Sequence, residues 1–394
     1  MLEALLLHLL AIPVFAWQLL RAVPAEGWRH VWKRIPLFGL IWILFSLLNL
    51  LHIVGHLADE VLFRNYRRTV IREPVFIIGI PRSGTTYLQR LLGCEQKFTT
   101  FSTWEAIFAP SISEKYFYRA LGWLTRPFNL IFRSIRQNLF RQMDTIHKLG
   151  LQEPEEDFLL LLPILGCFLP VFLCPDSTHY WKLGYFDKNV PTWHKKLILN
   201  FYRLCLQKHI FFHGKEKRLL SKNPSYTSWS ASLLSYFPDA RLIACTRSPQ
   251  EAVPSQLSAM GPAMKLLGSG LLSENTQNKL IELLYNYYFE LGNIQQNNRV
   301  YILPMTALQI DLKVTLLDLL NFLPFQPSSN FILSLELADE YSRSYKSSHH
   351  YHPGLFSLSD KLLAEKFHDV WPLSNSASEK RQQENGNSAQ PSFI

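Results

Sequence analysis

The chain has 394 residues, of which 48% are hydrophobic and 13% aromatic, and its formal net charge is +9. This is ample material for the core of one large α/β domain with extensions. The basic residues are spread along the chain, which argues against a nucleic-acid partner and fits anionic ligands or an anionic membrane surface equally well. The five cysteines are odd in number and show no pattern, which argues against a disulfide framework.

Two apolar stretches lie within residues 1–72. Ile35–Ala58 contains no Asp, Glu, Lys or Arg and is long enough for a membrane span. Met1–Leu20 is predicted to be a second span or an interfacial helix, and it shows neither a basic n-region nor a cleavage site of a signal peptide. A buried helical layer of the large α/β domain is the alternative. His52 and His56 have a spacing that can bind a metal on a helix, but no third ligand is near, and we interpret them as polar residues at the membrane edge.

The charge pattern does not indicate on which side of the membrane the large domain lies. Basic residues flank the predicted span on both sides, so the positive-inside rule does not choose. The unpatterned cysteines favour a reducing compartment. The sequon-like Asn223-Pro224-Ser225 is blocked by its proline, so no glycosylation is indicated. These features predict a membrane-associated chain whose large domain is cytoplasmic.

The stretch Glu73–Leu92 reads EPVFIIGIPRSGTTYLQRLL. It predicts a buried strand, a tight glycine loop and a helix that begins at Thr85, an arrangement whose backbone N–H groups and helix dipole bind anions. Gly79 and Gly84 keep the spacing of the phosphate loop of nucleotide triphosphatases, but Thr85 stands where that loop has its lysine, and Arg82 is the cation inside the loop. The motif is therefore a poor kinase loop.

The hexamer P-R-S-G-T-T resembles the 5′-phosphosulfate loop of sulfotransferases that use 3′-phosphoadenosine 5′-phosphosulfate (PAPS). The resemblance implies that the phosphosulfate is bound, without a metal, by Pro81, Arg82, Ser83, Gly84, Thr85 and Thr86.

Glu105 follows Arg82 by 23 residues. Sulfuryl transfer to a hydroxyl needs a base that takes the proton as the O–S bond forms. Tyrosylprotein sulfotransferases, which share the loop, use a Glu at a similar distance after it. The resemblance implies that Glu105 is the base, and a carboxylate on a helix surface is the alternative.

An acidic segment, Glu153–Asp157, has four carboxylates in five residues and precedes the uncharged run Phe158–Cys174. Similar acidic stretches occur in a bacterial branch of the sulfotransferase superfamily that this chain resembles. Glu155, Glu156 or His147 is therefore the second choice for the base. The apolar run is predicted to form an acceptor pocket or a membrane-dipping lid, with plain core packing as the alternative.

Two further motifs resemble the same family. A strand over Arg218–Pro224 ends in Lys222, where sulfotransferases place a lysine close to the oxygen that bridges phosphate and sulfate, so Arg82 and Lys222 are the candidates that stabilise the leaving group. The strand Arg241–Thr246 is followed by Arg247 and, eight residues later, by Ser255.

That Arg and Ser spacing in the family holds the 3′-phosphate of PAPS. The chemistry fits, because a guanidinium offers a planar fork of donors to a phosphate dianion and a hydroxyl near a helix start adds another donor.

The C-terminal third is predicted to complete the sheet with a helix over Thr276–Gln295, a strand over Val300–Leu303 and a helix over Leu312–Leu323. The fold class is thus α/β, a P-loop-like parallel sheet flanked by helices, with an N-terminal hydrophobic helical membrane segment.

The segment 346–359 resembles the serine, histidine and tyrosine segment of the bacterial branch. The Arg-Lys-Gly motif with which cytosolic sulfotransferases close over the 3′-phosphate is missing from it. Lys346 or His350 is a candidate substitute.

We therefore expect a membrane-anchoring region over residues 1–63, a sulfotransferase domain over 64–373 and a disordered polar tail over 374–394. The predicted function is transfer of a sulfuryl group from PAPS to a hydroxyl of a lipid or other amphiphilic acceptor. A nucleotide-binding membrane scaffold without transfer activity and a P-loop kinase or NTPase are the alternatives.

Overall fold

The computed structural model describes residues 2–23, 28–124, 151–266, 273–324, 326–344 and 359–373. The candidates His147, Lys346 and His350, and the predicted tail over 374–394, lie outside the described residues.

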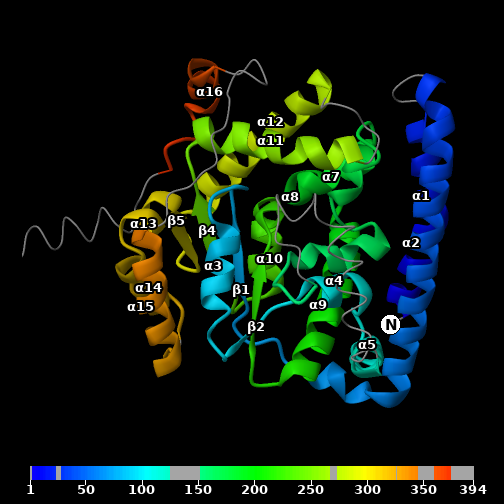
Figure 1. The fold of residues 1–394 in the computed structure, drawn as a ribbon, viewed down its shortest axis with the longest axis horizontal. Coiled ribbons are helices and arrows are strands. Elements are labelled where there is room, and N and C mark those ends of the chain that lie inside the picture. The colour runs from blue at the N-terminus through cyan, green and yellow to red at the C-terminus, as the bar shows by residue number, and fades with distance from the viewer. Residues whose placement is uncertain are drawn as a thin grey trace, which may run out of the picture.

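A five-stranded sheet forms the centre of the molecule (Figure 1). Its order is β2-β3-β1-β4-β5, and every neighbouring pair is parallel. The strands are β1 (Val75–Gly79), β2 (Phe98–Thr99), β3 (Arg218–Lys222), β4 (Arg241–Thr246) and β5 (Val300–Pro304). The α/β prediction and its four strands are confirmed. The two-residue β2 was not predicted, because so short a strand has no periodic pattern.

Helices cover both faces of the sheet (Figure 1). The α-helices are α1 (Leu2–Ala22), α2 (Trp28–Leu62), α3 (Thr85–Leu92), α4 (Thr103–Phe108), α5 (Ile112–Leu124), α7 (Thr178–Gly184), α8 (Phe186–Asn189), α9 (Thr192–His213), α10 (Ser230–Tyr236), α11 (Pro249–Leu266), α12 (Glu274–Ile294), α13 (Met305–Ile310), α14 (Leu312–Phe322), α15 (Ser329–Ser344) and α16 (Asp360–Phe367). The 3-10 helices are η2 (Arg64–Arg68), η4 (Asp157–Ile164), η5 (Leu169–Phe172) and η6 (Pro224–Trp229).

The central strand β1 is buried along its whole length. Successive side chains of a strand point to opposite faces, and β1 divides its side chains between two cores accordingly. Phe76 and Ile78 enter the larger core, and Val75 and Ile77 enter the smaller one against α3 and α14. A run of consecutive apolar residues is what a parallel strand covered on both faces requires.

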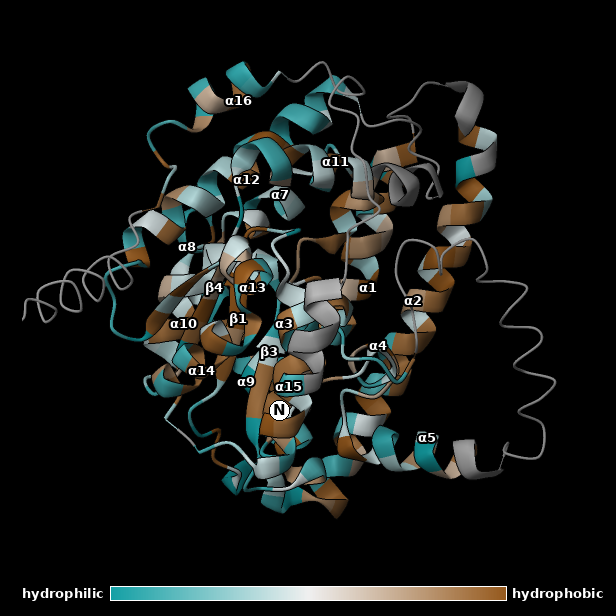
Figure 2. Ribbon diagram, turned by 60° about the vertical axis from the view of Figure 1, so that its left-hand side comes forward, coloured by the Kyte–Doolittle hydropathy of each residue, from teal (hydrophilic) through white to brown (hydrophobic). Residues whose placement is uncertain are grey.

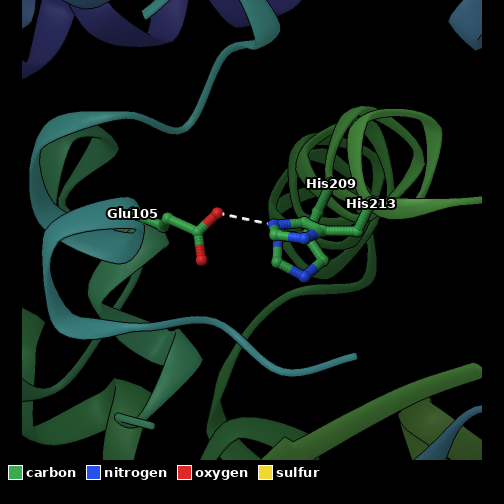
Figure 3. A group of neighbouring side chains, drawn as sticks. All are labelled: Glu105, His209 and His213. Atoms are coloured by element: carbon green, nitrogen blue, oxygen red, sulfur yellow. Dashed lines mark hydrogen bonds and ion pairs between the residues drawn. The ribbon is translucent and has the colours of Figure 1, made fainter. Parts of the chain in front are cut away.

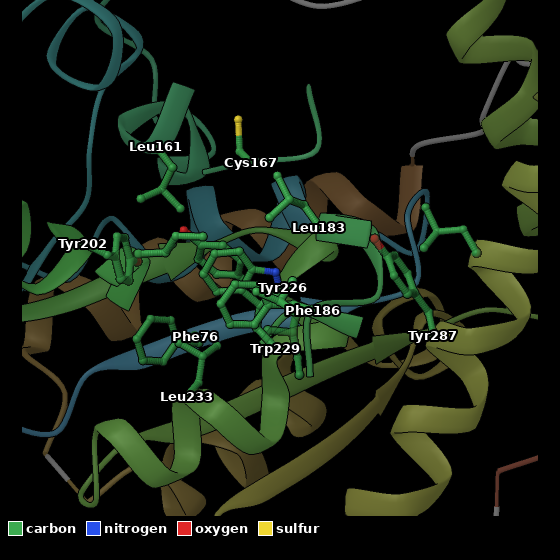
Figure 4. Close-up of a cluster of buried hydrophobic side chains, with 14 of the residues drawn as sticks. Phe76, Leu161, Cys167, Leu183, Phe186, Tyr202, Tyr226, Trp229, Leu233 and Tyr287 are labelled. Carbon is green, nitrogen blue, oxygen red and sulfur yellow. The ribbon is translucent and has the colours of Figure 1, made fainter. Parts of the chain in front are cut away.

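Aromatic rings dominate the larger core (Figure 4). The ring centroids of Phe186 and Trp229 lie 3.6 Å apart in a stacked arrangement, and Tyr226 lies 4.8 Å from Trp229. Figure 4 shows Phe76 of β1 and Tyr202 of α9 in the same cluster. This core holds η6 and α9 against the sheet and so positions the loops at the carboxyl ends of the strands.

The apolar run Phe158–Cys174 belongs to this core. It folds into η4 and η5, and Leu160, Leu161, Val171 and Cys174 are buried. The prediction of an acceptor pocket or a membrane-dipping lid is therefore wrong for most of the run. η4 buries apolar side chains between α1 and α9, and η5 packs against α7, which explains a stretch without charges.

The two N-terminal apolar helices lie side by side along one flank of the molecule (Figure 1). Leu2–Ala22 and Arg34–Leu62 are long and apolar enough to cross a membrane by length and composition. His8 Nδ1 bonds Asn49 Oδ1 at 2.7 Å across the pair. His52 and His56 are fully buried against the rest of the chain, so the interpretation as polar residues at a membrane edge is wrong.

Candidate active site

The order of the strands creates a topological switch point at the carboxyl ends of β1 and β4. From β1 the chain leaves into α3, whose Leu88 and Leu92 pack in the smaller core, and from β4 it leaves into α11, whose Val253 and Leu257 pack in the larger core. The two connections thus diverge to opposite faces of the sheet. Open α/β sheets bind their ligands at such a point.

The loop after β1 has the backbone shape of an anion cradle. The φ angles of Gly79, Arg82 and Gly84 are 122°, 67° and 85°, all in the left-handed region. A Cβ on Gly79 would lie 2.0 Å from the carbonyl oxygen of Cys245 in β4, so only glycine fits. Gly79 N also donates to Thr227 Oγ1 at 2.8 Å, which anchors the end of β1 to η6.

The remaining loop residues turn the chain into α3. Ser83 Oγ donates to the carbonyl oxygen of Ile80 at 2.5 Å, so this hydroxyl braces the loop. Thr85 is buried and Thr86 is half-buried at the start of α3, and Pro81 is half-buried before them. The predicted loop and helix start are therefore where the sequence indicated.

The two phosphate motifs meet in space although more than 160 residues separate them. Arg82 Nε donates to Ser255 Oγ at 3.1 Å, and Arg247 Nη1 donates to the carbonyl oxygen of Arg82 at 3.0 Å. Arg247 Nε also contacts Glu251 Oε2 at 3.2 Å, and Tyr288 donates its hydroxyl to the carbonyl oxygen of Arg247. Two guanidinium groups and one hydroxyl therefore converge at the carboxyl ends of β1 and β4.

Lys222 lies at the end of β3, beside β1, and its Nζ contacts Glu156 Oε1 at 2.8 Å. The Lys222 side chain is 4% exposed, whereas that of Glu156 is 28% exposed. The structure therefore joins the predicted leaving-group cation to one of the second-choice bases. Glu156 keeps access to solvent, which an acceptor hydroxyl would need to reach it.

The neighbouring carboxyl group of Asp157 is inside the protein. It accepts a hydrogen bond from the Tyr202 hydroxyl, which also lies 3.4 Å from Ser221 Oγ. Burial raises the pKa of Asp157 to about 6, against the lowering effect of these hydrogen bonds. Adjacent carboxylates of one segment thus have different environments, and Glu156 is the accessible one.

Glu105 is 3% exposed, and both of its carboxylate oxygens have partners. Its Oε2 accepts from the backbone N and Oγ of Ser102 in a capping box at the start of α4. Its Oε1 lies 2.9 Å from Lys115 Nζ and 2.6 Å from His213 Nε2. Burial would raise the pKa of Glu105, but the hydrogen bond with His213 and the charge of Lys115 outweigh it and hold the pKa far below its usual range.

Glu105, His209 and His213 form a cluster whose ligand atoms all lie within 4.8 Å of one another (Figure 3). Their donor types suit a divalent cation. However, the fully buried Lys115 Nζ contacts Glu105 Oε1, the same oxygen that faces His213. Its positive charge would repel a bound cation. The contacts favour a neutralised structural cluster over a metal centre.

Short backbone pairing places this cluster next to the acidic segment. Glu155 N donates to the carbonyl oxygen of Phe101 at 3.0 Å, and Thr103 N donates to that of Glu153 at 3.0 Å. The start of α4, which carries Glu105, is therefore tied to the segment that carries Glu156.

Comparison with known proteins identifies the family of the chain. Residues 74–324, more than half of the 394-residue chain, match the sulfotransferase family. The chain belongs to the sulfotransferase family. A search of curated protein sequences gives no match.

Solved sulfotransferase structures share the fold of this family member. Sulfotransferase STF1 from Mycobacterium tuberculosis is 18% identical, with a TM-score of 0.66 over 91% of this chain and 92% of that chain. Sulfotransferase STF9 from Mycobacterium avium is 14% identical, with a TM-score of 0.64 over 86% of this chain and 84% of that chain. At these identities the likeness shows a common fold.

Some residues of the site were not indicated by the sequence. Thr227 lies in the segment after Lys222 and carried no motif, yet it holds both backbone groups of Gly79. Lys115 and His213 belong to amphipathic helices, where a lysine or histidine is ordinary. A buried carboxylate needs a cationic partner, but the sequence does not indicate which lysine or histidine faces Glu105.

Proposed function

We propose that this enzyme transfers the sulfuryl group of PAPS to a hydroxyl of an amphiphilic acceptor. The observation that carries the proposal is the convergence of Arg82, Arg247 and Ser255 at the ends of β1 and β4. Either motif alone would bind an anion. Together they provide two anion sites at the same edge of the sheet, as a nucleotide with a 5′-phosphosulfate and a 3′-phosphate requires.

Each residue of the loop has a role that follows from its place. The backbone N–H groups of residues 82–86, which lead into the start of α3, would hold the phosphosulfate, because the left-handed φ angles of Arg82 and Gly84 curl the loop into a turn that can bind an anion. Arg247 and Ser255 would hold the 3′-phosphate. Arg82 and Lys222 would neutralise the charge that develops on the departing phosphate oxygen, since fixed cations aimed at that oxygen lower the barrier. No metal is needed in this scheme.

The reaction then balances with one base. The acceptor oxygen forms a bond to sulfur and gives its proton to a carboxylate, while the bond from sulfur to the phosphate oxygen breaks and 3′-phosphoadenosine 5′-phosphate (PAP) departs with the electron pair. We assign the base to Glu156, because it contacts Lys222 and is partly exposed. Glu105 remains the alternative, although its occupied oxygens and low pKa make it a weak proton acceptor.

The two carboxylates can be separated by substitution. Glu156→Gln is expected to lower turnover at least about 100-fold with PAP binding retained. Glu105→Gln is expected to lower stability while the folded fraction keeps its turnover. The assay is single-turnover transfer from PAPS with PAP affinity measured alongside. Loss of turnover in Glu105→Gln with normal turnover in Glu156→Gln would return the role of base to Glu105.

The donor is tested by calorimetric titration of the full chain with PAP and with adenosine 5′-phosphate, which lacks the 3′-phosphate. Arg247→Ala is expected to weaken PAP binding about 10- to 100-fold and to leave adenosine 5′-phosphate binding unchanged. Arg241→Ala is the matched control at the other end of β4, where its guanidinium donates to the carbonyl oxygen of Asn298. Equal losses for both ligands would refute the assignment.

The acceptor class rests on the position of the apolar helices. Glu156 directly precedes η4, and η4 packs against both α1 and α2. An acceptor whose apolar part lies near these helices would have its hydroxyl close to Glu156, because only η4 lies between the helices and that residue.

The five cysteines are free, which supports a reducing, cytoplasmic setting for the catalytic domain. PAP binding without turnover on any alcohol would instead support a scaffold, and ATP hydrolysis with Mg²⁺ would support a kinase.

A further inference from the structure

The helix pair α1 and α2 exposes a continuous apolar surface, here called the outer face. Figure 2 shows α2 as largely hydrophobic along its length. No Asp, Glu, Lys or Arg occurs from Ala4 to Leu20 or from Ile35 to Ala58. The outer face consists of side chains that are each at least 41% exposed: Leu6, Leu9, Leu10, Val14, Trp17, Leu20, Ile35, Leu40, Ile43, Leu44, Leu47, Leu50, Leu51, Val54, Leu57 and Val61. A patch of this extent on a folded chain marks a contact with another phase or partner.

The opposite face of the pair is bound to the catalytic domain by buried charges. Asp59 Oδ2 lies 2.9 Å from Lys208 Nζ of α9, and both side chains are 0% exposed. His56 Nδ1 lies 2.7 Å from the same Nζ. His52 Nδ1 lies 2.7 Å from Glu114 Oε1 of α5. Separating the helices from the domain would leave these charges without partners, so the contact is permanent.

The contact with the catalytic domain runs along most of α1. Near the start of the helix, Ala4 lines a cavity together with Phe201 and Leu204 of α9, and α1 also packs against η4. Near its far end, Gln18 Oε1 accepts from Ser177 Oγ of the catalytic domain at 2.9 Å. From Ala4 to Gln18 the helix rises about 21 Å at 1.5 Å per residue, so the catalytic domain flanks the pair over most of the thickness of a hydrocarbon core, which is about 30 Å.

A perpendicular span is incompatible with this flank. Next to α1, an open cavity of about 380 Å³ is lined by Glu3, Arg67 and Arg203. This cavity lies at one end of the pair, but the catalytic domain also packs beside α1 further along its length. A pair that crossed the bilayer would carry that flank of the catalytic domain into the hydrocarbon core, where polar and charged groups are costly. The helices can be docked on the catalytic domain or can cross a membrane, but they cannot do both.

We propose that the outer face lies flat in one leaflet of an anionic membrane, so that the protein is monotopic and its catalytic domain stays on the same side. Exposed cations stand at both ends of the pair: Arg21 at one end, and Arg64 and Arg68 of η2 at the other, where the neighbouring Arg67 pairs with Glu60. Such cations attract phosphate headgroups while the apolar face enters the acyl region. The proposal replaces the span expected from the sequence and does not depend on the identity of the sulfuryl donor.

Vesicle flotation of the full chain tests the lipid contact. The probes are phosphatidylcholine vesicles with and without phosphatidylserine. The triple variant Leu10→Glu, Leu44→Glu, Leu47→Glu is expected to lose at least about tenfold in bound fraction, because three charges enter the apolar face. The matched control is Val314→Glu with Leu333→Glu, two equally exposed positions on α14 and α15, which should bind as the unaltered chain does. Cooperative urea unfolding of every variant reports that the catalytic domain is folded.

Two results would overturn the lipid contact. One is unchanged vesicle binding of the triple variant. The other is a chain that ignores vesicles and forms a dimer that the triple variant abolishes, which would assign the outer face to a second copy.

Labelling with a membrane-impermeant maleimide separates a flat pair from a spanning one. Cys94 is exposed on the catalytic domain, and the other four cysteines are buried. In sealed vesicles from expressing cells, Arg21→Cys in a Cys94→Ser background should be labelled from the same side as Cys94 in the unaltered chain. Glu3→Cys is the control at the other end of α1. Protection of position 21 on the side where Cys94 is labelled would mean that the pair crosses the bilayer.

Discussion

The buried ion pair between Asp59 of α2 and Lys208 of α9 docks the helix pair on the catalytic domain, and breaking it is expected to lower the free energy of unfolding strongly. In Lys208→Met the side chain keeps its volume but loses the charge that faces Asp59 Oδ2 at 2.9 Å. Removing one partner of a buried pair costs about 3 to 5 kcal/mol in free energy of unfolding. Asp59 keeps hydrogen bonds from Ile112 N, Ser113 N and Ser113 Oγ, which compensate part of its charge. We therefore expect a loss near the lower limit, about 3 kcal/mol.

A double-mutant cycle measured by urea unfolding tests this reasoning. Lys208→Met combined with Asp59→Asn should cost less than the sum of the single changes by at least about 2 kcal/mol, because the second change removes the uncompensated charge. The control is the exposed pair Lys313 and Glu336, whose atoms are also 2.9 Å apart. Its coupling should stay below about 1 kcal/mol. A Lys208 and Asp59 coupling no larger than that of the exposed pair would refute permanent docking of the helices.

Three further predictions concern the site and its pH dependence. Gly79→Ala should prevent stable folding, since its Cβ would meet the carbonyl oxygen of Cys245 at 2.0 Å, whereas Gly292→Ala, with its nearest neighbour at 3.9 Å, should be neutral or slightly stabilising in thermal unfolding. Asp157 has a raised pKa of about 6, so its stabilising contribution is present at low pH and lost as the pH rises through 6. Asp157→Asn should therefore gain about 2 to 3 kcal/mol relative to the unaltered chain between pH 4 and pH 7.5, and a constant difference would contradict the buried carboxyl. Glu105 has a lowered pKa and behaves in the opposite way: its contribution is present above pH 4.5 and declines as the pH falls below that value, so the cost of Glu105→Gln in urea unfolding should shrink in acid, and a cost that grows in acid would exclude the ion pairs described.

Much of the catalytic fold follows from patterns that are local in the sequence. Val75–Gly79 and Arg241–Thr246 are buried strands because short apolar runs between turn residues have few other stable forms. The loop after β1 follows from its glycines, since Gly79 and Gly84 adopt φ values that other residues avoid. The resemblance to sulfotransferases rested on equally local motifs, and the family match confirms the family.

What the tertiary structure alone decided is which charges meet. Glu105 and Glu156 are both acidic residues near a predicted site, and only the fold encloses the first with Lys115 and places the second against Lys222. The same holds for the N-terminal helices, whose composition suits a membrane span. Whether these helices dock on the catalytic domain depends on the ion pair between Asp59 and Lys208, which are about 150 positions apart in the sequence. Conformational preferences act over neighbouring residues, but the free energy of a buried charge depends on partners from distant segments, which no local pattern specifies.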